Sequence, residues 1–249
     1  MKKIILLGLV SFLLAGLWLL PLSFAKPYAE KYVKGLHLKG VTGTVWRGGA
    51  QSLTIAGLDF DEVNWRVLPL KSLTSLSLKL SFDIDSRDFQ ATGFAGLTPS
   101  KKVIIDDMNF DLDAEYINTI QKYAKTSGDI IGNIKHGEFD ETNLPIVNAV
   151  IDWKAAAVSS PIKLAQGDYQ AIITPESDGI HINLASSDAP MELDGSIKLN
   201  KEWLYDVNVN VKSSDPSLAP MIGILGKKQP NGTTKLTRKG DLKPLIGKK

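Results

Sequence analysis

The sequence contains no cysteine and only three histidines, which excludes disulfide bonds and thiolate metal sites. The histidines His37, His136 and His181 are far apart, and no carboxylate lies at metal-ligand spacing beside any pair of them, so no catalytic zinc site is expected. The chain also lacks a G-x-S-x-G nucleophile motif, a P-loop and a dinucleotide-binding fingerprint. We therefore expect no catalytic residues, no cofactor and no metal, and hence no enzyme.

One carboxylate pair remains as a catalytic candidate. Asp106 and Asp107 are adjacent, and neighbouring side chains on a strand point to opposite faces of the sheet. The two carboxylates would then not converge on a substrate, and a solvated strand or turn is the better interpretation.

Charge is absent from an apolar run near the N-terminus, Ile4 to Phe24, which follows two lysines. About 20 helical residues span a hydrocarbon core of about 30 Å. We expect residues 1–25 to form an uncleaved membrane anchor, with 26–249 in the periplasm because the lysines stay in the cytoplasm. A cleaved signal peptide is the alternative, with Ser23 to Ala25 as the small-x-small site.

Beyond the apolar run, the main pattern is an alternation of apolar and polar residues with a period of two. It is clearest in residues 76–84, 147–155, 180–184 and 203–211. This pattern is typical of strands with one packed and one solvated face. We predict a mainly β fold after the transmembrane helix, either a curved antiparallel sheet or a β-sandwich.

Two segments depart from the strand pattern and predict short helices. The first covers about 114–125, where apolar residues recur at helical spacing and Asp113 provides the N-cap. The second covers about 218–225 and is kept short by two prolines. Further on, Asn231-Gly232 is a strong hairpin signal, with Lys235 to Thr237 as the returning strand.

A weak internal repeat suggests that the β region is duplicated. The segment G-T-V-W-R-G resembles G-N-I-K-H-G, and each is followed by a tryptophan, Trp65 or Trp153, at nearly the same distance. The repeat units would be 40–128 and 129–215. The C-terminal segment 227–249 differs in composition, because it carries a charge of +7 and leaves −5 on the rest of the chain.

The most informative local pattern lies between residues 40 and 69. Gly40 and Gly43 predict a tight turn, residues 44–46 begin a strand, and Gly48 with Gly49 predicts a second bend. A later strand with alternating apolar residues should end before a proline that follows it. A strand pair with two buried tryptophans explains these residues, and a direct binding role is the alternative.

The same segment resembles type II secretion system protein N, the general secretion pathway protein N family. The resemblance rests on G-V-x-G-T-V-W-x-G and W-x-V-x-P downstream of one membrane segment, and it covers roughly the first 70 residues most specifically. A looser likeness returns near the C-terminus, whereas in the middle only the strand pattern matches. The matching residues are Gly40, Gly43, Thr44, Trp46, Gly48, Trp65 and Pro69.

The resemblance implies an inner-membrane accessory component of the machinery that exports folded proteins across the outer membrane, with no catalytic residues and with other secretion components as partners. The family is also similar to AsmA-like envelope proteins, which implies lipid binding or transfer as the alternative function. A sheet with one uncovered apolar face would suit acyl chains. The basic C-terminal segment lacks interleaved aromatics, so a nucleic-acid partner is not expected; anionic lipid or an acidic protein suits it better, and a solvated face is equally compatible.

Overall fold

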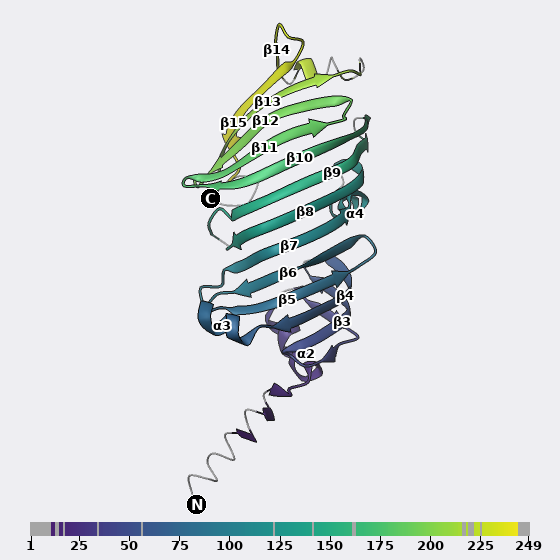
Figure 1. The fold of residues 1–249 in the computed structure, drawn as a ribbon. Coiled ribbons are helices and arrows are strands. Elements are labelled where there is room, and N and C mark those ends of the chain that lie inside the picture. The colour runs from purple at the N-terminus through teal and green to yellow at the C-terminus, as the bar shows by residue number, and fades with distance from the viewer. Residues whose placement is uncertain are drawn as a thin grey trace, which may run out of the picture. The chain divides into compact units, whose positions relative to one another are not determined.

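The computed structural model of the chain describes residues 11–12, 15–16, 18–33, 35–55, 57–121, 123–140, 142–160, 163–215, 218, 222–224 and 226–243. The chain divides into two compact units, residues 1–96 and 97–249. Strands predominate in both units, and neighbouring strands in the chain mostly pair with each other (Figure 1). The mainly β prediction is therefore confirmed.

The first unit is an antiparallel sheet with two flanking helices. Its strands lie side by side in the order β1-β3-β4-β5-β6, and the short β2 pairs with β3. The elements are α2 (Leu22–Tyr32), β1 (His37–Lys39), β2 (Thr42–Gly43), β3 (Arg47–Ile55), β4 (Leu58–Val67), α3 (Pro69–Ser75), β5 (Leu78–Asp85) and β6 (Phe89–Leu97).

Helix α2 is fastened to this sheet by specific contacts. The carboxylate of Glu30 accepts a hydrogen bond of 2.8 Å from the backbone N–H of Leu38 in β1. Leu22, at the start of the helix, is buried, and so is Leu38. The core of the first unit continues through buried side chains on β3, β4 and β6, namely Ala50, Val63, Val67 and Ala91.

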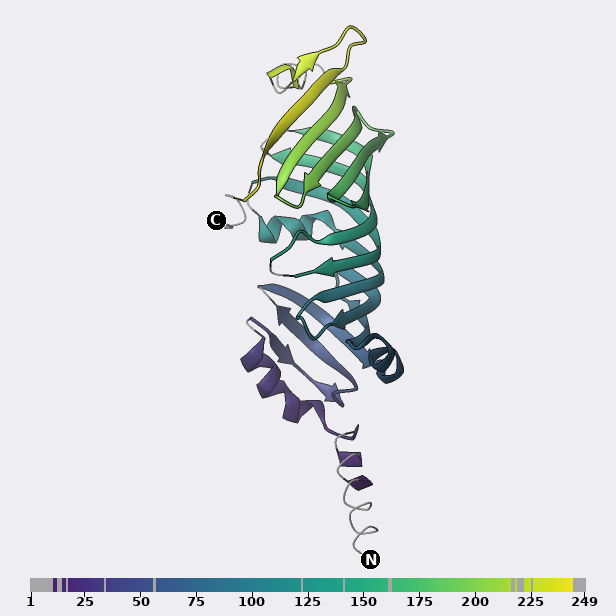
Figure 2. The ribbon, with the colours of Figure 1, turned by 90° about the vertical axis from the view of Figure 1, so that its left-hand side faces the viewer.

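The second unit is a longer antiparallel sheet in which the strands follow chain order up to β13, which then pairs with β15. Figure 2 shows that this sheet is curved and that its short helix lies on the concave side. The elements are β7 (Val103–Asp113), α4 (Ala114–Ile120), β8 (Lys125–Phe139), β9 (Ile146–Ser160), β10 (Leu164–Glu176), β11 (Gly179–Ser187), β12 (Met191–Asn200), β13 (Leu204–Ser213), β14 (Lys227–Lys228) and β15 (Thr234–Asp241).

The strand register of the second unit aligns apolar residues in rows that cross the sheet, and we call the side that carries them the apolar face. Two adjacent rows are Gly132, Ile151, Ala171, Leu184, Gly195 and Val209, and Ile134, Ala149, Ile173, Ile182, Ile197 and Val207. At one end, Val209 and Val211 form a buried cluster with Leu218 and Ile222 from the segment between β13 and β14. Within each unit the described strands form one sheet, so the alternative of a β-sandwich is not observed there.

Several local predictions can be compared directly with these elements. The strands expected at 147–155, 180–184 and 203–211 correspond to β9, β11 and β13. The hairpin around Asn231 and Gly232 is confirmed, because Gly232 has a φ of 82° and Lys228 pairs with Thr234. The helix expected at 114–125 is shorter, since α4 ends at Ile120, but Asp113 caps it as predicted by accepting a 2.8 Å bond from the N–H of Glu115.

Two expectations around the motif were wrong. Residues 44–46 form the turn between β2 and β3 rather than the start of a strand, and Gly48 and Gly49 lie within β3 rather than at a bend. The reason is that the hydrogen bonds of Gly48 and Gly49 go to two neighbours, β2 and β4, so both glycines are held in extended ladders.

No described helix is long and apolar enough to cross a membrane. Residues 1–10, 13, 14 and 17 of the predicted anchor lie outside the described residues. Helix α2 begins only at Leu22, after an N-cap at Pro21, and contains charged residues.

Candidate functional site

The motif between Gly40 and Gly48 folds into a tight turn between β2 and β3. Gly43 pairs with Gly48, and Thr44 closes the turn by hydrogen bonds with Arg47. The backbone N–H of Thr44 donates to the carbonyl of Arg47 at 2.9 Å, and the N–H of Arg47 donates to the Thr44 hydroxyl at 3.2 Å. Gly43 has a φ of 79°, a conformation that glycine adopts without strain.

The two motif tryptophans are joined to this turn. The indole N–H of Trp65 in β4 donates to the carbonyl of Val45 at 3.1 Å. The carbonyl of Trp46 accepts a bond of 2.7 Å from the N–H of Val67. Both tryptophans are half-buried rather than fully buried. Hydrogen bonds therefore connect both tryptophans to one turn, and the structural role of the motif stays a prediction.

The remaining motif residues lie at the edges of this arrangement. Gly40 has a φ of 61° between β1 and β2. A side chain at Gly48 would collide with backbone, because an added Cβ would lie 2.7 Å from the carbonyl oxygen of Thr44. Pro69 is the first residue of α3, where a missing N–H costs nothing.

The segment that precedes α2 packs against the same turn. The rings of Trp18 and Trp46 are stacked, with centroids 5.6 Å apart and planes 17° apart. The N–H of Val45 donates to the carbonyl of Leu20 at 3.2 Å, and Pro21 forms an isolated bridge with Thr44. The motif turn is thus the place where the end of the apolar run meets the first sheet.

The polar side of β3 to β5 contains a hollow of about 520 Å³ that sequence analysis missed. We call it the arginine hollow, and its lining includes Gly49 and the polar residues Arg47, Asn64, Arg66, Ser81 and Asp83. Arg47 and Arg66 are exposed and lie directly opposite each other in the β3–β4 ladder. From the sequence, this arginine pair could have been found only by following the alternation of side chains along β3 and β4 and by knowing the register between the two strands.

Helix α3 presents an exposed apolar ridge. Leu70 and Leu73 of the helix are 80% and 74% exposed, and Leu76, the left-handed C-cap that follows the helix, is 80% exposed. Residues three apart in a helix lie on neighbouring parts of its surface. Exposed apolar patches of this kind are typical of interaction sites.

The apolar face of the second unit is only partly covered. Most of its aliphatic side chains are half-buried, and no large side chain in the described residues is fully buried. Trp153 and Tyr169 extend this face, with ring centroids 6.5 Å apart. The Tyr169 hydroxyl is buried without a hydrogen-bond partner in the described structure, and burial raises its pKa. Among the described residues the face is therefore apolar, and it contains the unsatisfied hydroxyl of Tyr169.

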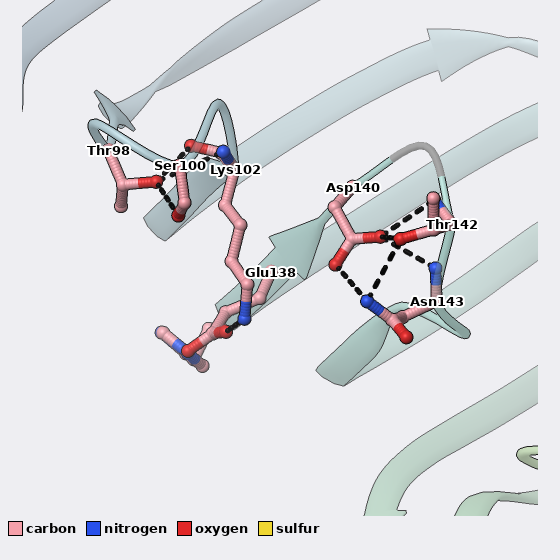
Figure 3. A network of polar contacts seen from close by, with 8 residues as sticks. Thr98, Ser100, Lys102, Glu138, Asp140, Thr142 and Asn143 are labelled. Carbon is pink, nitrogen blue, oxygen red and sulfur yellow. Dashed lines mark hydrogen bonds and ion pairs between the residues drawn. The ribbon is translucent and has the colours of Figure 1, made fainter.

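Polar contacts are found in two loops of the second unit (Figure 3). One loop is closed by Thr98, whose hydroxyl accepts a 3.0 Å bond from the N–H of Lys102. The ammonium of Lys102 lies 3.4 Å from a carboxylate oxygen of Glu138. In the other loop, Asp140 accepts bonds from Asn143, which hold the pKa of this carboxyl well below its usual range. These contacts fix the conformation of each loop.

His136 stands beside this network between two carboxylates. Its Nδ1 lies 2.7 Å from Asp106, and its Nε2 lies 3.4 Å from Glu138. The hydrogen bond that Asp106 accepts is the largest cause of a raised pKa at His136; partial burial acts in the opposite direction, and the contact with Glu138 raises the pKa further. Asp107 has a left-handed backbone conformation, with a φ of 47°. Unlike Asp106, which pairs with His136, it has no paired residue in the β7–β8 ladder.

In the described part of the chain, no group of three or more histidine, aspartate or glutamate side chains is arranged to hold a metal ion. The described residues therefore define an antiparallel β protein with the motif turn, the arginine hollow and exposed apolar surfaces. A family model described as type II secretion system (T2SS), protein N, matches residues 34–237, and the chain belongs to this family. A search of curated proteins gave no match, and a search of solved structures gave none either.

Proposed function

We propose that the protein is an accessory, non-catalytic component of the type II secretion machinery. In this proposal residues 1–25 anchor it in the inner membrane by a single pass, and residues 26–249 form a periplasmic domain. The observation that carries the proposal is the family match over residues 34–237. The apolar run after two lysines supports the topology.

The protein would act through contacts with other secretion components. The apolar ridge of α3 is the best candidate surface, because its leucines are exposed to solvent rather than buried in the unit to which they belong. Burying such side chains against a partner contributes about 1.5 to 3 kcal/mol each. The ridge would therefore provide affinity without any polar chemistry.

Deletion of the gene and complementation with variants tests this function. Wild-type protein should restore secretion of exported enzymes, whereas the Leu70→Gln/Leu73→Gln variant should reach the same cellular level and fail to restore it. The matched control is Ile131→Gln/Leu204→Gln, which changes two exposed apolar residues in the second unit and should complement. Secretion that does not change on deletion, with no secretion component co-purifying, would contradict the proposal.

Lipid binding is a second candidate, and the half-exposed apolar face of the second unit favours it. Acyl chains would cover aliphatic rows that the described residues leave open. The test is mass spectrometry of lipids extracted from residues 26–249, produced without the proposed anchor and purified without detergent. Stoichiometric phospholipid would support this function, and its absence would eliminate it.

A further inference from the structure

The arginine hollow contains a pair of like charges in an unfavourable arrangement. Arg47 and Arg66 are directly opposite residues of adjacent antiparallel strands, which places their Cβ atoms roughly 4.5 to 5.5 Å apart. Like charges in such pairs destabilise a sheet. Among the described residues, neither guanidinium forms an ion pair. An anion bound between the two side chains would relieve this repulsion.

The shape of the hollow leaves room for such an anion. Gly49 follows on the same face of β3, and because it has no side chain the amide of Asn64 lies over it; the hollow of about 520 Å³ is bounded by this amide and by Arg47 and Arg66. Asn64 lies opposite Gly49, and Ser81 lies opposite Arg66. Guanidinium, amide and hydroxyl groups can all donate hydrogen bonds, and two arginines match the oxygens of a phosphate in particular.

Asp83 is the one carboxylate in the lining of the hollow. It pairs with Asn64 and not with Arg66, so it lies in the next row of the ladder. It forms no ion pair with either arginine. The lining therefore keeps a net positive charge, and Asp83 reduces the attraction for anions.

The position of the hollow in the chain identifies the source of the phosphate. Arg47 closes the turn on which Trp46 stacks with Trp18, at the end of the apolar run. Tryptophan is enriched at membrane interfaces, where its ring lies at the level of lipid head groups. If the apolar run spans the membrane, as proposed above, then the hollow lies within a few residues of the lipid phosphates.

We propose that Arg47 and Arg66 form a binding site for the phosphate of an anionic phospholipid head group. Only the location of this site at the membrane depends on the proposed anchor, because the guanidinium pair itself belongs to the folded sheet. Its role would be to fix the first unit against the membrane surface. It is separate from the apolar face of the second unit and needs no acyl chain to enter the protein.

Native mass spectrometry and thermal unfolding of the full chain in neutral detergent test the site, with short-chain phosphatidylglycerol as the probe and short-chain phosphatidylcholine as the uncharged comparison. Wild-type protein should bind and be stabilised by phosphatidylglycerol in preference to phosphatidylcholine. Arg47→Gln/Arg66→Gln should weaken phosphatidylglycerol binding about tenfold or more, since bonds to charged groups are strong. Lys228→Gln/Arg238→Gln removes the same charge from exposed positions in the second unit and should have little effect.

Loss of binding in the double variant could also result from misfolding, so a variant that is expected to bind more tightly completes the test. Asp83→Asn should bind phosphatidylglycerol more tightly than the wild type, because it removes the carboxylate from the lining. Three results would overturn the proposal. The first is equal binding of phosphatidylglycerol and phosphatidylcholine, and the second is an equal loss of phosphatidylglycerol binding in the control variant. The third is competition by millimolar inorganic phosphate as strong as competition by lipid, which would indicate a site for free phosphate. Secretion assays are independent of this readout, so failure of the site leaves the proposed secretion function standing.

Discussion

At His136, two carboxylates face one imidazole, and this arrangement makes a pH prediction. The hydrogen bond that Asp106 accepts from the ring is the largest cause of a pKa above the ordinary value of 6.5. A raised pKa in the folded state means that the protonated ring stabilises the fold, fully so below pH 6.5, and that the contribution is lost as the pH rises through the folded pKa. NMR titration of the His136 ring should give a midpoint above 6.5.

The matched variant for this titration is Asp106→Asn. It keeps the size of the side chain but removes the charge that faces His136 at 2.7 Å. The midpoint should fall towards 6.5, while the remaining neighbour Glu138 holds it from falling further. A midpoint that stays where it was in the wild type would mean that Asp106 does not control the ring.

Alanine substitutions at two glycines with similar backbone angles should distinguish the cost of backbone strain from the cost of a steric clash. Gly43 and Gly57 have φ values of 79° and 85°, but a Cβ at Gly43 would lie 2.5 Å from the carbonyl oxygen of Arg47, whereas one at Gly57 would meet nothing within 4 Å. Gly57→Ala should therefore cost about 1 kcal/mol from backbone strain alone, and Gly43→Ala clearly more. Urea unfolding of both variants measures the difference, and equal losses would show that the motif turn relaxes freely.

At the scale of elements, the sequence predicted strands better than it predicted the ends of helices. Period-two alternation is a direct consequence of pleating, so β9, β11 and β13 could be located in advance. The end of α4 could not, because Gln121 leaves the helix while its side-chain amide bonds to Ala124, a local interaction that no spacing rule contains. The end of this helix is set by one glutamine.

The motif turn shows the same limit at the candidate site. Glycines at 48 and 49 indicated a bend, yet Gly48 is a glycine because β2 and Leu22 approach it closely. The arginine hollow depends on which residue of β3 faces which residue of β4. A change of register by one residue would separate Arg47 from Arg66, so only the structure could bring them together.

The two tryptophans of the proposed repeat make similar hydrogen bonds, but the strand pairing around them differs. Trp65 lies opposite Gly48, and its indole donates to Val45; Trp153 lies opposite Ile130, and its indole donates to Ser127 at 3.1 Å. Gly137, the counterpart of Gly48 in the proposed repeat, pairs with Val147 instead. The duplication therefore stays a prediction, and the tryptophans are better described by their own contacts.

Each tryptophan should stabilise the strand pair that it joins. Because Trp65 and Trp153 are half-buried, Trp→Ala should cost about 2 to 4 kcal/mol at either position, less than the largest core truncations. Trp→Phe keeps most of the apolar contact and loses only the indole N–H, so its cost should be about 1 kcal/mol. Thermal unfolding tests both. A Trp65→Ala variant with an unchanged melting temperature and impaired secretion would instead make Trp65 part of a binding surface.

For the whole molecule, periodicity could not decide between an open sheet and a sandwich. Alternation predicts one apolar side for every strand but does not say what covers that side. The described residues give single sheets whose apolar side chains stay half-buried, as in the rows that contain Ile151 and Ile182. Family membership, in contrast, could be inferred from the motif between Gly40 and Pro69, because those residues are fixed by local geometry.

The last prediction concerns how the chain is held at the membrane. If Ile4 to Phe24 is an uncleaved anchor, intact protein should remain in the membrane pellet after carbonate washing, with an N-terminus that still includes the two lysines. The contacts of Leu20 and Pro21 with the motif turn give this test a second part. Because Trp18 stacks on Trp46 at 5.6 Å, cleavage after Ala25 would remove that partner and the buried Leu22. A soluble protein that begins at Lys26 would therefore contradict the anchor, and it should also unfold at a lower temperature than the intact chain. Edman sequencing of both fractions, together with thermal unfolding, distinguishes the two outcomes.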